Sequence, residues 1–158
     1  MRESDHDLRR SIQGFVRAFG LLAGDQTPCG QPLPPSHAHA LMVLLEQERA
    51  SGPAGLKQQD LAEAIGLDKS SVTRLCARMM SAGHLHQVPS ETDGRAWTLS
   101  LSAKGRRVAK TVQDASQARF RRLAAALPES VPVAEAVRIV TALTAAAVSS
   151  AENERKTP

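Results

Sequence analysis

The stretch Asp68-Lys69-Ser70-Ser71-Val72-Thr73-Arg74-Leu75-Cys76-Ala77-Arg78-Met79-Met80 decides the fold of this 158-residue chain. Its apolar side chains recur at the i, i+3, i+4, i+7, i+8 spacing of one helical face, at positions 72, 75, 76, 79 and 80. The other positions carry mostly hydroxyls and cations. The stretch therefore predicts a helix with one face in the core and a polar, cationic face exposed.

A second short helix is predicted just upstream, over residues 58–65. Gly66 follows it, at a position where a left-handed backbone ends a helix without steric cost. Asp68 then offers a carboxylate that can cap the next N-terminus. Two short helices joined by so tight a turn predict a helix-turn-helix.

After Gly83 the sequence changes from a helical to an alternating period. Residues 84–88 and 95–101 alternate polar and apolar side chains around the polar turn sequence 89–94. Residues 56–57 can add a short bridging strand to this hairpin. A helix-turn-helix followed at once by a β-hairpin predicts a winged helix.

Four longer helices are predicted around this unit, over residues 5–22, 37–49, 102–127 and 130–150. The second of them is apolar nearly all round, which predicts a central, buried helix. The polar tail 152–158 is expected to fray. The predicted fold is therefore mainly α (α+β), a winged helix-turn-helix with flanking N- and C-terminal helices, in a single domain over 1–158.

The composition is basic and poor in aromatic side chains. Lys and Arg number 20 against 16 acidic residues, giving a net charge of +4 and a sequence pI near 9.6. Aromatics make up 3% of the chain and tyrosine is absent, which argues against stacking single-stranded bases on aromatic platforms. Duplex DNA, bound through cations and small hydroxyls, fits this composition.

The reactive side chains indicate no enzyme and no cofactor. Cys29 and Cys76 form neither a metal-binding spacing nor a disulfide framework. His37 and His39 do not share a helical face, and His84 and His86 lack a neighbouring cysteine or acidic ligand. The chain has no Gly-rich phosphate loop and no nucleophile elbow. Because we find no apolar signal region and no apolar run near the length of a membrane span, we expect a cytoplasmic protein without a membrane partner.

Five short motifs, in order along the chain, resemble the MarR family of bacterial regulators over roughly residues 36–107. They are Asp60-Leu61-Ala62, Ile65-Gly66-Leu67, Ser70-Ser71-Val72-Thr73-Arg74, the wing tip Asp93-Gly94-Arg95, and the wing exit Leu99-Ser100-Leu101-Ser102-Ala103-Lys104-Gly105. The resemblance implies a transcriptional regulator, most often a repressor. Its DNA-binding unit would be residues 36–105, and residues 5–22 and 106–150 would form a homodimer interface.

A homodimer places two recognition helices about one turn of DNA, roughly 34 Å, apart, so the expected operator is an inverted repeat in double-stranded DNA. Ser70, Ser71 and Arg74 are expected to touch base edges, because Arg suits guanine and Ser suits either kind of edge. Lys69 and Arg78 lie at the margins of the polar face and suit phosphates. The residues of this helix expected to contact DNA are Lys69, Ser70, Ser71, Thr73, Arg74 and Arg78.

The predicted wing tip adds two further residues. Arg95 is expected to enter the flanking minor groove, where a narrow A·T segment concentrates negative potential. Asp93 can hold the guanidinium in place by a charge-assisted pair.

The resemblance also implies a small-molecule effector that releases DNA, bound between the dimer helices and the winged unit. Residues of this sequence that can line such a pocket are Phe15, Phe19, His37 and Met42. Two alternatives stay open: a winged helix that uses its cationic face for a protein partner, and a regulator that senses redox state through Cys29. Cations on both the helix and the wing tip favour DNA.

Replacing the wing cation tests its assigned role. Arg95→Ala is expected to weaken binding to a palindromic duplex and to lower the slope of log affinity against log salt by about one, because one groove-bound cation is lost. Fluorescence anisotropy at several salt concentrations measures both quantities. Arg10→Ala, a cation of the first predicted helix, is the matched control, and equal slopes in the two variants would contradict the role.

Overall fold

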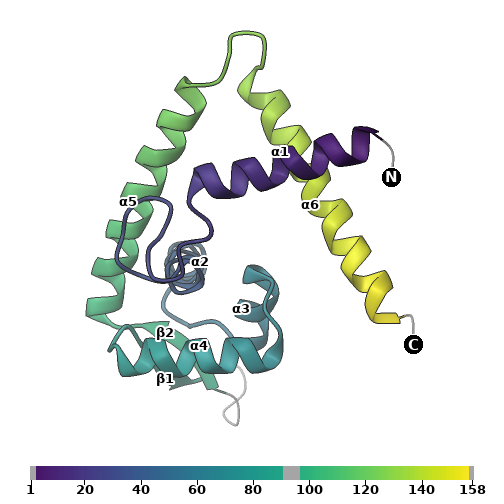
Figure 1. Cartoon of the computed structure of the whole chain (residues 1–158). Helices are drawn as coiled ribbons and strands as arrows, with labels where there is room; N and C mark the ends of the chain where they lie inside the picture. The colour runs from purple at the N-terminus through teal and green to yellow at the C-terminus, as the bar shows by residue number, and fades with distance from the viewer. Residues whose placement is uncertain (1–2, 91–96, 157–158) are drawn as a thin grey trace. The chain divides into compact units, whose positions relative to one another are not determined.

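The computed structural model describes residues 3–90 and 97–156 and is mostly helical (Figure 1). The chain divides into two compact units, Met1–Arg119 and Phe120–Pro158. The elements run in the order α1 (Glu3–Phe19), α2 (Pro35–Ser51), α3 (Gln58–Ile65), α4 (Lys69–Ser81), β1 (Leu85–Pro89), β2 (Trp97–Leu101), α5 (Ala103–Ala125) and α6 (Val133–Lys156). The predicted winged helix-turn-helix with flanking helices is confirmed, and α5 begins in the first unit and ends in the second.

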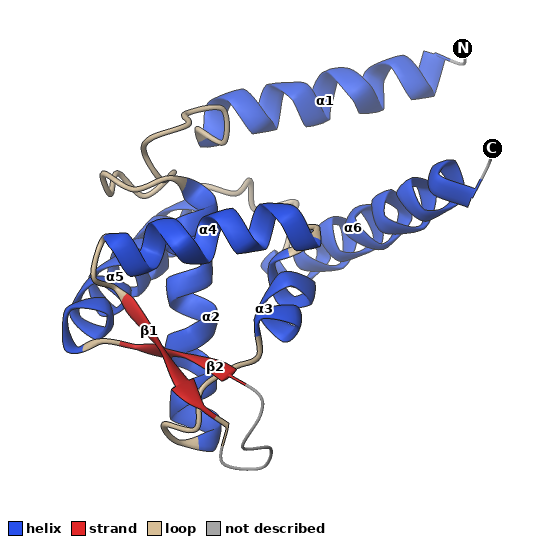
Figure 2. Cartoon of the chain, turned by 90° about the horizontal axis from the view of Figure 1, so that it is seen from below, coloured by secondary structure: helices blue, strands red, loops and turns tan. Residues whose placement is uncertain are grey.

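Helix α2 is the centre of the core of the first unit. It contacts α3, α4 and β2, and Figure 2 shows it lying behind α4 and the two strands. Leu41 of α2, Leu61 of α3, Leu75 and Met79 of α4 and Leu99 of β2 are all 2% exposed or less. The predicted apolar face of the 68–80 stretch is therefore the face that packs into this core.

The turn between α3 and α4 follows the sequence prediction. Gly66 ends α3 with a φ of +70°, and its N–H points back to the last carbonyls of that helix. Asp68 precedes the first residue of α4 and accepts hydrogen bonds from the backbone of its first turn. Gly83, with a φ of +72°, follows the end of α4 and turns the chain into the wing.

Strands β1 and β2 form an antiparallel pair in which Leu85 faces Leu101 and Gln87 faces Leu99. The predicted bridging strand is a single bridge: the N–H and carbonyl of Leu56 both bond Leu99, at 2.9 and 2.8 Å. Gly55 makes this approach possible, because a Cβ on it would lie 2.6 Å from Thr98 Oγ1. The wing is thereby tied to the segment that precedes α3.

Two helix ends differ from the sequence prediction. The first helix was expected to reach residue 22, but it ends at Phe19 because Gly20 adopts a φ of +87°. The last helix was expected to end near 150 with a frayed tail, but α6 continues to Lys156. The residues that extend it, including Ala151 and Glu152, are good helix formers.

Helix α6 also corrects the expectation about apolar runs. Residues Val133–Glu154 are long and apolar enough to cross a membrane by length and composition, with a mean hydropathy of 1.4. The sequence pattern concealed this run because its hydropathy comes from alanine and valine spread among threonines and serines. One such helix is weak ground for a membrane protein, since core helices of soluble proteins meet the same measure.

Two helical glycines give a matched test of the packing at the start of α5. A Cβ on Gly105 would lie 1.9 Å from the backbone carbonyl oxygen of His84, whereas a Cβ on Gly14 of α1 would meet nothing within 4 Å. Gly105→Ala should therefore cost about 1–3 kcal/mol of unfolding free energy. Gly14→Ala should stabilise by about 0.5–1 kcal/mol, because alanine favours the helix. Urea denaturation measures both, and a neutral Gly105→Ala would contradict the contact.

Candidate nucleic-acid interface

The N-terminus of α4 is organised by one carboxylate. Asp68 accepts hydrogen bonds from the backbone N–H groups of Ser70 and Ser71, each at 2.9 Å, and from their hydroxyls, each at 2.7 Å. The hydrogen bonds of the Ser70 side chain and then of Ser71 hold the pKa of the Asp68 carboxyl well below its usual range. Asp68 is therefore ionised at neutral pH and complements the positive end of the helix dipole.

This cap fixes the direction in which the two serines can bond. Each hydroxyl proton of Ser70 and Ser71 is donated to Asp68, so their oxygen lone pairs remain to accept hydrogen bonds from outside. The sequence alone predicts that both serines contact base edges, and it does not distinguish a donor from an acceptor role. While the cap is intact, the two serine hydroxyls can therefore only accept hydrogen bonds, and they can bond only to donor groups of a ligand.

The exposed cations lie beside these hydroxyls on the same helix. Lys69, Arg74 and Arg78 are all exposed, and the guanidinium of Arg74 makes a long contact of 3.4 Å with Ser71 Oγ. A hollow of about 580 Å³ borders this face. It is lined by Ser36, Leu67, Ser71, Arg74, Leu75, Ala77 and Arg78. The structure thus brings together most of the predicted contact residues of α4.

Thr73 has a different environment. Its hydroxyl donates to the Lys69 carbonyl at 2.8 Å and accepts from Gln58 Nε2, also at 2.8 Å. Thr73 therefore ties α4 to the first residue of α3. Gln58 was not among the predicted site residues, although its place as a polar side chain at the start of the first helix of a helix-turn-helix was a usable signal.

The α4–wing joint, residues 82–84 with 102–105, connects this helix to the hairpin. Ser102 Oγ donates to the Gly83 carbonyl at 2.7 Å and accepts from the Gly105 N–H at 2.9 Å, and Ser102 N–H donates to the His84 carbonyl at 3.0 Å. Lys104 Nζ donates to the Ala82 carbonyl at 2.7 Å. The start of α5 thus satisfies three successive carbonyls at the end of α4 and the entry to the wing.

A histidine pair lies at the same joint. His37 Nε2 and His84 Nδ1 are 2.9 Å apart, and both residues are 6% exposed. Burial, followed by the charges of His84 and Arg78, lowers the pKa of His37 to about 4. Burial and then Lys104 lower the pKa of His84 as well. Both rings are therefore neutral at neutral pH.

The four predicted effector-pocket residues are not gathered in one described cavity. Phe15 and Phe19 stack with ring centroids 5.2 Å apart, and the Arg119 guanidinium lies 5.4 Å from the Phe19 centroid. His37 bonds His84 instead, and Met42 is half-buried in α2. None of the four lines the hollow beside α4 or the small pocket between the end of α2 and β2.

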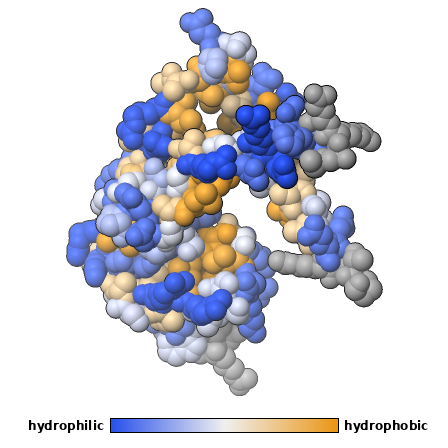
Figure 3. Space-filling model, in the orientation of Figure 1, coloured by the Kyte–Doolittle hydropathy of each residue, from blue (hydrophilic) through white to orange (hydrophobic). Residues whose placement is uncertain are grey.

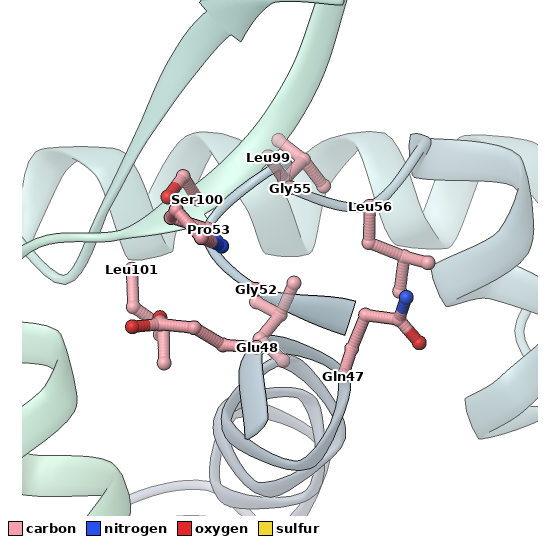
Figure 4. Close-up of a pocket in the computed structure, with 10 residues that line it drawn as sticks. Gln47, Glu48, Gly52, Pro53, Gly55, Leu56, Leu99, Ser100 and Leu101 are labelled. Atoms are coloured by element: carbon pink, nitrogen blue, oxygen red, sulfur yellow. The ribbon is translucent and has the colours of Figure 1, made fainter. Parts of the chain in front are cut away.

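A second pocket lies where the end of α2 meets β2 (Figure 4). Its volume is about 10 Å³, which is room for about one water molecule. Glu48 on its wall pairs with Arg106 of α5. The pocket is too small for an organic ligand and belongs to the packing of the wing against α2.

The remaining predicted residues fall into two groups. Asp93 and Arg95 lie outside the described residues. Cys29 is half-buried with its Sγ 3.0 Å from Thr27 Oγ1, while Cys76 is buried, and burial raises the pKa of its thiol. Within residues 3–90 and 97–156, no group of three or more His, Cys, Asp or Glu side chains is placed to hold a metal ion.

Comparison with known proteins agrees with this geometry. Residues 31–96, which span the helix-turn-helix and the start of the wing, match the model of the MarR family. Over these residues, which make up less than half of the chain, the sequence is similar to the MarR family. No curated protein matches the sequence significantly. The matched family and the similar solved structures are transcriptional regulators rather than enzymes.

Three solved structures illustrate how far the fold is shared beyond the MarR-family segment. A probable transcriptional regulator from Pseudomonas aeruginosa aligns with a TM-score of 0.64 at 23% identity, covering 90% of this chain and 96% of its own. Bordetella bronchiseptica BpsR, whose DNA binding is regulated by 6-hydroxynicotinic acid, aligns at 0.61 with 21% identity, covering 92% and 94%. S. aureus MepR in complex with DNA aligns at 0.59 with 16% identity, covering 92% and 89%. These likenesses show a common fold over nearly the whole chain.

Proposed function

We propose that this protein is a sequence-specific regulator of transcription that binds double-stranded DNA through α4. The observation that carries the proposal is the exposed face of that helix, where oriented serine oxygens adjoin Arg74 and Arg78 in a MarR-family domain. Hydroxyls and cations at a helix N-terminus match the requirements of the major groove. MepR, which shares the fold, has been solved bound to DNA.

The bonds within α4 define what each side chain can recognise. Arg74 suits the paired acceptors O6 and N7 of guanine. Ser70 and Ser71, whose protons go to Asp68, suit the amino groups of cytosine or adenine. One donor side chain and two acceptor side chains within the first two turns of α4 favour particular base pairs over general affinity for DNA.

Phosphate contacts complete the interface. Lys69 and Arg78 are exposed cations at the two margins of this face, and Gln58 adds an amide tied to α4 through Thr73. Such side chains fix the register of the helix on DNA without reading sequence. We extend the proposal to Arg95 in the minor groove, with Asp93 as its partner, on the sequence of the wing tip.

We further propose that the protein acts as a cytoplasmic homodimer on an inverted repeat, as a repressor. Support comes from α6, whose residues from 137 to 154 are all exposed and whose valines form a stripe; Figure 3 shows apolar surface there in tan and orange. Val137 and Val140 are 58% and 57% exposed. An apolar stripe on a lone helix needs a covering partner, and a second copy supplies an identical stripe.

An effector belongs to the same proposal, because BpsR shares the fold and its DNA binding is regulated by 6-hydroxynicotinic acid. A small molecule that prefers a dimer geometry mismatched to the groove spacing would release DNA by population shift. A metabolite panel in which no compound lowers DNA affinity would count against this part.

Two arginines of α4 are expected to behave differently. Arg74→Ala should relax the preference at one base pair per half-site, at a cost of about 1–3 kcal/mol to the preferred sequence. Arg78→Ala should instead weaken all sequences alike and lower the salt slope by about one. Selection of bound fragments from a random duplex library, followed by anisotropy, measures both effects. Lys110→Ala, an exposed cation of α5, is the control, and unchanged binding in both arginine variants would refute the proposal.

If the apolar stripe on α6 is the dimer interface, charges placed on it should dissociate the dimer. Val137→Glu combined with Val140→Glu should raise the dimer dissociation constant by at least about 100-fold, because two charges would be buried unpaired. Ala142→Glu adds charge on the opposite side of the helix and should leave the dimer intact. Sedimentation equilibrium distinguishes the two results. A dimer unaffected by the valine changes would place the interface elsewhere.

A further inference from the structure

The histidine pair His37–His84 connects two elements that are far apart in sequence. The rings meet edge to face with centroids 5.0 Å apart, and one ring nitrogen donates to the other across 2.9 Å. His37 belongs to the first turn of α2, the central helix of the core. His84 lies between the end of α4 and the start of β1. The pair is therefore a direct side-chain bond between the core and the α4–wing joint.

The backbone of His84 is bonded on both sides of the joint. Its N–H donates to the Met79 carbonyl at 2.9 Å, and its carbonyl accepts from Ser102. A displacement of the His84 backbone therefore moves the last turn of α4 or the entry to the wing. These two elements carry the residues assigned to DNA.

The charged groups that act on the pair are both cations. Arg78 of α4 acts on His37 and Lys104 of α5 acts on His84. Two cations oppose a bound metal ion, and no third ligand joins the two ring nitrogens among the described residues. The same two cations also repel a proton that enters the pair, so protonation destabilises the closed contact without any further ligand. The pair thus suits proton sensing better than metal binding.

We propose that the histidine pair is a proton-sensitive contact: neutral, it holds the α4–wing joint against α2, and protonated, it releases the joint and weakens DNA binding. The last clause rests on the proposed function, because DNA affinity is the output. The release itself is a property of the free protein.

The chemistry of the release follows from the imidazole nitrogens. In the neutral pair one N–H donates to one lone pair, so a single hydrogen bond uses both facing nitrogens. When both rings are protonated, N–H faces N–H and two positive charges meet beside Arg78 and Lys104. Opening of the joint then exposes each ring to water, where the charge is solvated.

The direction of the effect distinguishes the buried pair from exposed histidines. His39 and His86 are exposed, and added positive charge on the protein surface strengthens binding to DNA. Release of the buried pair instead lowers DNA affinity as the pH falls. The sign of the pH dependence therefore reports which histidines dominate.

The proton-sensitive contact is tested by comparing the wild type with His37→Gln/His84→Asn. Gln places an amide near the Nε2 position and Asn near the Nδ1 position, so this variant keeps an uncharged hydrogen bond that does not titrate. His39→Gln is the matched control. Anisotropy at constant ionic strength gives DNA affinity at pH 7.5 and 5.0, and circular dichroism at both values shows that each variant is folded.

We expect wild type and His39→Gln to lose more than about threefold in DNA affinity at pH 5.0 relative to the double variant. Hydrogen exchange of the Ser102 and His84 amides tests the release without DNA. With His37 at a pKa of about 4 in the closed joint and 6.5 in the open one, corrected exchange should rise by about 30-fold between pH 7.5 and 5.0.

The outcomes separate the two proposals. Faster exchange in the wild type alone, without DNA binding at either pH, would uphold the contact and refute the proposed function. Equal pH dependence of exchange in the wild type and the double variant would refute the contact. If the wild type and the double variant gained DNA affinity equally at pH 5.0, the histidine pair would have no role in DNA binding.

Discussion

The arrangement of α4, the wing and the start of α5 depends on one close backbone contact, the approach of the His84 carbonyl to Gly105. Only a residue without a Cβ allows α5 to begin there, and the hydroxyl of Ser102 then bonds both the end of α4 and the first turn of α5. Three elements therefore converge on a few atoms. The end of α4, the wing and the start of α5 are therefore bonded to one another at this point.

Local patterns predicted the elements of the first unit because each is encoded by neighbours in sequence. The apolar spacing from Val72 to Met80 predicted which face of α4 is buried, and Gly66 with Asp68 predicted the turn. The contacts that tune the site were not predictable in this way. Gln58 meets Thr73 over 15 residues and His37 meets His84 over 47, and no periodicity encodes such pairs. The direction of the serine hydroxyls likewise follows from the folded cap, not from the identity of the residues.

The second unit shows the opposite relation between sequence and structure. Its stripe of valines was predicted, yet α6 has little to pack on within its own unit, and residues 137–154 are exposed. A pattern can specify an apolar face without specifying its partner. Two helix ends were predicted wrongly, the end of α1 before Gly20 and the continuation of α6 to Lys156. In both cases local helix signals outweighed the composition of the flanking segments.

The continuity of α5 has a mechanical consequence. Its 23 residues make a rod about 34 Å long, anchored at one end by Ser102 and Gly105. For a rigid rod, a rotation of about 10° at the anchored end displaces the far end by about 6 Å. That displacement is comparable with one helical turn. Helix α5 is therefore long enough to act as a lever arm, because a small rotation at its base becomes a displacement of about one helical turn at its far end.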